Sequence, residues 1–190
     1  MVYKLITPPT EQALTLAEAK KQLNIEEAFT DDDTLITSFI NASALYVEKI
    51  IQGPLMNQVW EAQLKDFASC IELQKTPIAS IDSVKYYDTA NVDTTVNASN
   101  YQTDLSSVPA RIIFNSTYSY PSVYDRFDAV RVRLTAGYAS ASVVPADVKQ
   151  VIKLLLTHFN ENRGPEVTGS ITAKFDLSIE KLLHGHMPWL

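Results

Sequence analysis

The stretch DDDTLITSFINASALYVEKIIQ, residues 31–52, decides the fold of this chain, because its apolar residues recur at helical spacing and then stop abruptly. Three aspartates lead it, where carboxylates cap free N–H groups and favour the positive end of the helix dipole. Gly53 and Pro54 follow it, and a glycine then a proline is a common helix stop. We therefore predict a helix from Asp31 to Gln52, capped by the aspartates and ended by Gly53.

The apolar surface of this predicted helix is too wide for a single core. At 100° per residue it covers about half the circumference, whereas a helix on a globular domain usually presents a stripe of about 100°. Its members are Leu35, Ile36, Phe39, Ile40, Ala44, Tyr46, Val47, Ile50 and Ile51. The polar side carries one further large apolar residue, Leu45. This surplus indicates a subunit of an assembly, and we predict that Leu45 is exposed in the isolated chain and covered by a neighbouring subunit.

Three further helices are indicated. Thr15 and Glu18 have capping-box spacing, which predicts a short helix from Leu16 to Leu23. Pro145 suits the first turn of a helix that we expect to reach Asn162, with an apolar stripe of Val148, Ile152, Leu155 and Phe159. A piece from Ser178 to His184, in the tail after Gly164 and Pro165, is too short to be stable unless it docks on something.

Between the helices, the apolar period changes from about 3.6 to 2, which indicates strands from about Asn57 to Tyr138. Within the last strand Arg131 and Arg133 share one face, and we predict that they pair with acids, either within the sheet or across a subunit boundary. Seven tyrosines fall in this region, and they suit both a half-buried sheet and a protein contact. The predicted fold class is therefore α+β, a small helical bundle with an inserted, mainly antiparallel β region.

Composition narrows the function classes. The chain has 190 residues, enough for one domain with its own core, and the single Cys70 excludes an internal disulfide framework. We expect that thiol to be buried and inert. The net charge of −6 disfavours a sequence-specific nucleic-acid binder, which needs clustered Lys and Arg. The start lacks signal-peptide features, and no stretch reaches the roughly 20 apolar residues that span a membrane, so we expect a soluble intracellular product.

The residues that could carry catalysis or bind a metal are few. His158 lies beside an apolar stripe, where a packed or rim histidine is expected, and His184 and His186 lack the further ligands that zinc requires. The aspartates 31–33 are adjacent and do not converge as metal ligands should, so capping is their expected role. No nucleophile elbow, phosphate loop or His-Glu-x-x-His motif occurs. We therefore expect no catalytic residues, no cofactor and no metal.

Several segments, taken in order, resemble the head–tail connector (adaptor) proteins of tailed bacteriophages and prophages. They are LTLAEAKKQL (14–23), DDDTLITSFI (31–40), YVEK (46–49), WE (60–61), VRVRLTAGY (130–138), VPADVKQVI (144–152) and HFNENR (158–163). The resemblance covers nearly the whole chain, and it implies one connector domain over residues 1–190. In that domain 16–52 and 145–162 form the bundle, 57–138 the β-rich insertion and 163–190 a docking tail.

The resemblance also implies a structural function. Copies, typically twelve, form a homo-oligomeric ring beneath the portal protein at the capsid vertex. The ring extends the DNA channel and joins the capsid to a downstream head-completion, stopper or tail protein. It implies synthesis in the host bacterial cytoplasm and a final place at the head–tail junction of the virion. DNA then only passes through, and no membrane is involved.

Two residue sets follow from this implied role. The subunit interface is expected to include Leu45, Arg131 and Arg133. The portal is expected to bind the chain end, Met187, Pro188, Trp189 and Leu190, where Trp189 could act as an interface anchor; folding of this tail back onto its own helices is the alternative. A head-to-tail ring uses two different faces of each subunit. A non-catalytic ligand-binding β module, or a hydrolase, remains as an alternative function.

Overall fold

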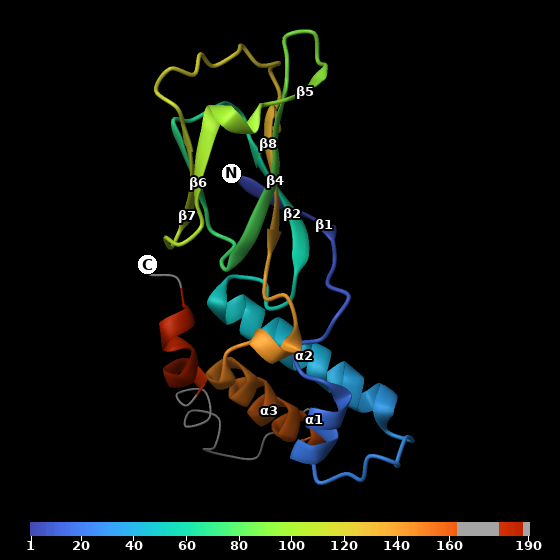
Figure 1. The fold of residues 1–190 in the computed structure, drawn as a ribbon. Coiled ribbons are helices and arrows are strands. Elements are labelled where there is room, and N and C mark those ends of the chain that lie inside the picture. Colours follow the sequence, from blue (N-terminus) through green and yellow to red (C-terminus); the bar gives the residue numbers. More distant parts are fainter. Residues whose placement is uncertain (163–178, 188–190) are drawn as a thin grey trace. The chain divides into compact units, whose positions relative to one another are not determined.

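The computed structural model describes residues 1–162 and 179–187, and it divides the chain into two compact units (Figure 1). The β unit contains Met1–Thr10 and Asn57–Ala139. The helical unit contains Glu11–Met56 and the described residues from Ser140 onward. The mixed α+β class and the placement of the β region between helices are as predicted.

The helical unit packs three main helices: α1 (Leu16–Gln22), α2 (Asp33–Ile51) and α3 (Ala146–Glu161). Helix α2 lies against α3, α1 contacts both, and Phe39 meets Phe159 with ring centroids 6.2 Å apart. The short 3₁₀ helix η2 (Ala141–Val143) precedes α3. The core side of α3 matches the predicted stripe, except that Phe159 is only half-buried; the buried residues are Val148, Val151, Ile152, Leu155 and Leu156.

The ends of the helices follow the sequence signals in part. The predicted capping box is present, since Glu18 N donates to Thr15 Oγ1 at 3.2 Å and Thr15 N donates to Glu18 Oε2 at 3.0 Å. Asp32 is the N-cap of α2, but its side chain makes no capping hydrogen bond, so the predicted aspartate cap is wrong for that residue. Its backbone (φ −95°, ψ 3°) departs from the extended conformation usual at an N-cap.

The end of α2 also differs from the prediction. The left-handed residue is Gln52, with φ 54°, rather than Gly53. Pro54 restricts the residue before it to extended backbone, so the left-handed step falls one residue earlier. Glu48 then fixes the exit from the helix, because its Oε1 accepts a hydrogen bond from Leu55 N at 2.8 Å.

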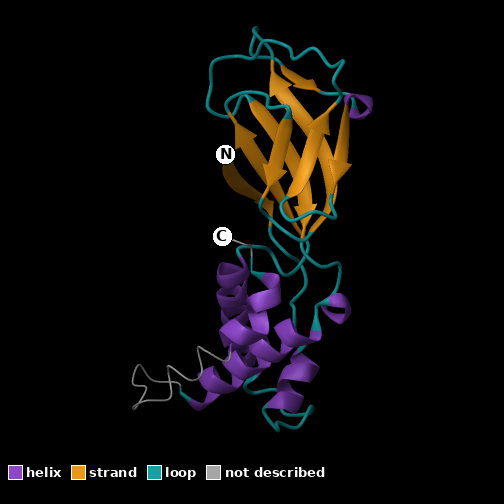
Figure 2. Cartoon of the chain, turned by 90° about the vertical axis from the view of Figure 1, so that its left-hand side faces the viewer, coloured by secondary structure: helices purple, strands orange, loops and turns teal. Residues whose placement is uncertain are grey.

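The β unit is built from two antiparallel sheets that enclose one core (Figure 2). The five-stranded sheet has the order β1-β2-β8-β4-β5 and the three-stranded sheet the order β3-β7-β6. The strands are β1 (Val2–Thr7), β2 (Gln58–Leu64), β3 (Cys70–Leu73), β4 (Ile78–Tyr87), β5 (Asp93–Thr95), β6 (Tyr101–Asp104), β7 (Ala110–Phe114) and β8 (Val130–Ala136), with the 3₁₀ helix η1 (Ala98–Asn100) before β6. Val84, Val132 and Leu134 of the larger sheet share the core with Ile71 and Ile112 of the smaller one.

Two features of the β unit depart from the sequence analysis. Strand β1, from the chain start, pairs with β2 in a register that sets Tyr3 opposite Ala62, and no strand was predicted there. Cys70 is exposed, so its predicted burial is wrong. Successive side chains of β3 point to opposite faces of the sheet. Ile71 and Leu73 face the core, so the Cys70 thiol faces outward.

Candidate functional site

The outer side of α2 holds the first predicted site residue. Within the helical unit α2 buries a narrow stripe, Ile36, Ile40, Ser43, Val47 and Ile51, and leaves Tyr46 39% exposed. Leu45 is 57% exposed, which confirms its predicted exposure. Ser38, Ala42 and Lys49 are exposed beside it at helical spacing. Ser38 and Ala42 are small, so Leu45 can project beyond them into a partner, and this face can serve as an assembly surface.

The segment between α1 and α2 is held by a buried lysine that the sequence analysis missed. Lys20 is 4% exposed, and its Nζ donates to the backbone oxygens of Glu27 at 3.1 Å and Phe29 at 2.8 Å. The same Nζ forms an ion pair with Asp33 Oδ1 at 2.6 Å. One cation therefore ties down the acidic segment ahead of α2. The sequence could have indicated the burial of Lys20, because this residue follows Ala19 and both lie on the core side of α1.

A depression of about 390 Å³ lies beside this segment in the helical unit. Its lining residues are Ala17, Glu18, Lys20, Lys21, Ile25 and Glu27. Glu18 also pairs with Lys149 of α3, at 2.9 Å between Oε1 and Nζ. Burial raises the pKa of the Glu18 carboxyl, but hydrogen bonds from Lys149 and Thr15 outweigh it and lower the pKa to about 2. Glu18 is therefore an anion at neutral pH.

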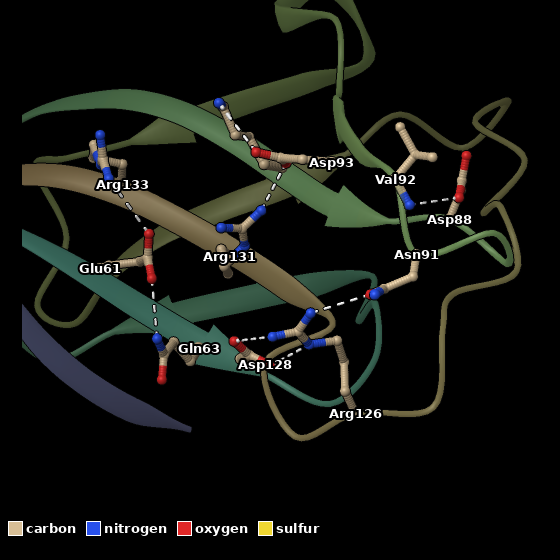
Figure 3. A network of polar contacts seen from close by, with 11 residues as sticks. Glu61, Gln63, Asp88, Asn91, Val92, Asp93, Arg126, Asp128, Arg131 and Arg133 are labelled. Atoms are coloured by element: carbon tan, nitrogen blue, oxygen red, sulfur yellow. Dashed lines mark hydrogen bonds and ion pairs between the residues drawn. The ribbon is translucent and has the colours of Figure 1, made fainter.

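Arg131 and Arg133 lie on β8 and pair with acids of the same unit, as Figure 3 shows. Arg131 Nη2 contacts Asp93 Oδ1 of β5 at 2.6 Å, and Arg133 Nη2 lies 3.6 Å from Glu61 Oε2 of β2. Gln63 Nε2 donates to Glu61 Oε1 at 3.0 Å. Pairing within the sheet is one of the two predicted arrangements. A role of these arginines at a subunit boundary stays a prediction.

A second arginine cluster holds two loops of the β unit together (Figure 3). Arg126 Nη1 donates to Asn91 Oδ1 at 3.1 Å, and Arg126 Nη2 donates to Asp128 Oδ2 at 2.9 Å. The hydrogen bond from Arg126 lowers the pKa of the Asp128 carboxyl. The guanidinium carbons of Arg126 and Arg131 lie 3.9 and 4.1 Å from the Tyr87 ring centroid. Sequence reasoning missed this cluster, because its members come from three separate segments.

The tyrosines of the β region divide between packing and exposure. Phe67 lies 5.5 to 6.3 Å, between ring centroids, from the rings of Tyr86, Phe114, Tyr118 and Tyr120. Tyr120 and Tyr124 are each 43% exposed, and Phe127 is 71% exposed. Sheet packing, one of the two expected uses of tyrosine, therefore occurs in this unit, and use of the exposed tyrosines in a protein contact stays a prediction.

The last described residues dock on the helical unit. Residues 179–183 are helical, with Ile179 and Leu183 buried, and a 3₁₀ turn, η3 (His184–His186), follows. His186 Nε2 lies 2.8 Å from Asp147 Oδ2 at the start of α3. Burial raises the pKa of Asp147, but the contact with His186 outweighs it and lowers the pKa. The predicted docking of this short helix is confirmed. Met187 is half-buried, whereas residues 163–178 and Pro188, Trp189 and Leu190 of the predicted tail lie outside the described residues.

The histidines and acids of the described part of the chain do not gather into a metal site. Within 1–162 and 179–187, no group of three or more His, Cys, Asp or Glu side chains could hold a metal ion. His158 is half-buried with its ring 6.0 Å from that of Phe159, as expected for a rim histidine. No helix in the described part of the chain is both long and apolar enough to cross a bilayer.

Comparison with known proteins identifies the class. The family model described as phage gp6-like head-tail connector protein matches residues 13–118. This match spans more than half of the chain, so the chain belongs to the phage gp6-like head-tail connector family, a family of structural connectors. No curated protein matches the chain.

Solved structures with the same fold come from gene transfer agent particles. A chain from the neck of an empty particle, computed with C6 symmetry, has a TM-score of 0.78 at 21% identity, over 100% of this chain and 97% of that one. A chain from the virion of the native particle gives the same values. A chain from the native neck, computed with C12 symmetry, has a TM-score of 0.77 at 20% identity with the same coverage. At this identity the likeness establishes the fold of both units.

Proposed function

We propose that this protein is a structural subunit of the phage neck, without catalytic activity, that forms a ring beneath the portal. Twelve copies extend the DNA channel and join the capsid to a stopper or tail protein. The subunit is made in the host cytoplasm and ends in the virion. The family membership carries this proposal, because the matched segment includes α1, α2 and most of the β unit.

The symmetry of the similar particles supports the ring. The necks with this fold were computed with C6 and C12 symmetry. A cyclic ring requires a head-to-tail contact between two different faces of each subunit. Contacts repeated around such a ring reinforce one another, so each can be modest and the free protein can be monomeric.

Three surfaces of the chain take the expected contacts in this proposal. Leu45 on α2 contacts a neighbouring subunit, and it is the most exposed large apolar side chain of that helix. Arg131 and Arg133, on one face of β8, contact a neighbouring subunit, and 47% of the Arg133 side chain is exposed for this contact. The segment Met187, Pro188, Trp189 and Leu190 binds the portal. The two units act together as one connector domain.

In this proposal, DNA passes through the channel of the ring without being bound by it. The net charge of −6 gives the ring a surface that does not hold phosphates, and Arg126, Arg131 and Arg133 of the β unit are already paired with acids. Sequence-specific binding is therefore not part of the function.

Electron microscopy tests the proposal directly. The purified protein is imaged alone, with portal particles, and with an unrelated acidic protein of similar size as a control. We expect rings alone at high concentration or rings seated on portal. Particles that stay monomeric in both preparations, over the whole accessible concentration range, would overturn the proposed function.

A further inference from the structure

We propose that Leu45 and Lys49 of one copy dock on the depression beside α1 of the next copy, with Lys49 facing Glu27. This inference rests on the proposed ring and names its lateral contact. It joins two different surfaces of the same helical unit, as a closed ring requires. Contact of the α2 face with itself would give a two-fold dimer instead of a ring.

The donor surface is the outer face of α2. Ser38, Ala42, Leu45 and Lys49 are spaced at 4, 3 and 4 residues, which places them on one side of the helix. All four are exposed, and Leu45 is the only large apolar side chain among them. The small side chains of Ser38 and Ala42 let a partner approach closely, so Leu45 projects beyond them, with the cation of Lys49 one turn away.

The acceptor surface is the depression of about 390 Å³ beside α1. Ala17 and Ile25 contribute apolar surface to this depression, and an aliphatic side chain can pack against it. The Lys20 hydrogen bonds to the backbone oxygens of Glu27 and Phe29 hold the loop side of the depression in place. A surface that is already ordered loses little conformational entropy when a partner docks.

The charges of the two surfaces indicate that a second copy of this chain occupies the depression. Glu27 lines the depression and is exposed, as is Glu26 next to it in the sequence, and Lys49 is exposed on α2. The exposed Lys21 also lines the depression, from α1, so the acids define the side that Lys49 faces. A lysine one helical turn from Leu45 matches a depression in which the apolar Ala17 and Ile25 lie together with the acidic Glu27. Opposite charges at an interface favour the correct pairing and register, whereas like charges oppose it. A second copy of this chain carries both halves of this match.

Charge reversal tests the pairing. Lys49→Glu presents an acid on both surfaces, and Glu27→Lys presents a lysine on both, so each variant alone places like charges across the contact. We expect each to need at least a tenfold higher concentration for half-maximal ring assembly, measured by sedimentation velocity. An equimolar mixture should recover assembly, because alternating copies restore opposite charges at every contact. The double variant with both substitutions should also assemble.

The controls separate this inference from the proposed function. Both residues are exposed, so thermal unfolding of each variant should match that of the wild type. Lys181→Glu reverses another exposed lysine of the helical unit and should assemble normally. Wild-type rings together with unimpaired single variants, or with a mixture that fails to recover, would overturn the pairing and leave the ring intact. Absence of wild-type rings, alone and on portal, would overturn both.

Discussion

Glu18 of α1 accepts a hydrogen bond from Lys149 of α3 at 2.9 Å, although the two residues are 131 positions apart in the sequence. The same carboxylate accepts the backbone N–H of Thr15 at 3.0 Å in the capping box. A single side chain therefore both starts a helix and joins it to another helix that begins after the β region.

This contact predicts a pH dependence of stability. The pKa of Glu18 is lowered from 4.5 to about 2, because hydrogen bonds from Lys149 and Thr15 outweigh the effect of burial. A depressed carboxyl pKa stabilises the fold above the unfolded-state pKa, and the benefit is lost as the pH falls from about 4.5 toward 2. We expect Glu18→Gln to cost about 1 kcal/mol at pH 7, after allowance for solvent screening, and much less near pH 2.

Urea unfolding followed by circular dichroism at 222 nm measures this difference at each pH. Lys149→Met alone and the double variant complete a mutant cycle, and the coupling between the two sites should vanish at low pH. A coupling that is the same at pH 7 and pH 2.5 would show that the charge of Glu18 is not the cause.

Lys20→Met should be among the most destabilising substitutions of a charged residue in the helical unit. Lys20 is 4% exposed, and its ammonium group contacts two backbone oxygens and Asp33, so its loss leaves these acceptors without their cation. We expect a loss of about 2–3 kcal/mol in the free energy of unfolding. Lys21→Met, one residue on and exposed, is the matched control and should change stability by less than about 0.5 kcal/mol. Equal effects of the two substitutions would contradict this account.

The elements that could be predicted from sequence are those fixed by local patterns. The capping box at Thr15, the apolar stripe of α3 and the alternation of β8 each follow from neighbours within a few residues. Strand β1 could not be predicted in this way, because its six residues, four of them exposed, become a strand only through pairing with β2, more than 50 positions later. The exposure of Cys70 could not be predicted, because pairing with β7 and packing against the core decide which side chains of β3 face inward.

In the candidate site, too, the features set by local sequence could be predicted and those set by tertiary contacts could not. The exposure of Leu45 follows from the helical wheel of α2 alone. The depression beside α1 depends on a loop whose conformation is set by Lys20, and no local pattern encodes where a lysine finds its carbonyl oxygens. Arg131 and Arg133 were placed correctly on one face, but Asp93 and Glu61 became their partners only through the strand order of the larger sheet.

Replacing Arg131 and Arg133 together with Gln should weaken the larger sheet. Glu61 is 8% exposed, and the side chain of Arg131 is 15% exposed, so both pairs are partly shielded from water. We expect a loss of about 1–2 kcal/mol in the unfolding of the β unit. For the subunit boundary, rings of the double variant should dissociate at lower salt than wild-type rings. Rings with unchanged salt resistance would restrict both arginines to a role inside the sheet.

Leu45→Asp should abolish ring assembly without unfolding the subunit. The side chain is 57% exposed, so its replacement removes little buried area, and the melting temperature should stay within about 1–2 °C of the wild type. A carboxylate in an apolar contact is costly to desolvate, so rings should be lost. Val143→Asp changes a side chain of similar exposure, 55%, in η2 and should leave assembly intact. Intact rings of Leu45→Asp, seen by sedimentation velocity, would exclude Leu45 from the interface.

Removal of Met187, Pro188, Trp189 and Leu190 tests the portal contact. The preceding helix is held by buried Ile179 and Leu183 and by the contact of His186 with Asp147, so it should stay docked after truncation. The truncated protein should therefore keep its melting temperature but no longer co-sediment with portal. Trp189→Ala should cause most of the same loss, because a large aromatic anchor dominates interface energy. A lowered melting temperature with portal binding retained would show that these residues stabilise the subunit itself, and that the portal binds elsewhere.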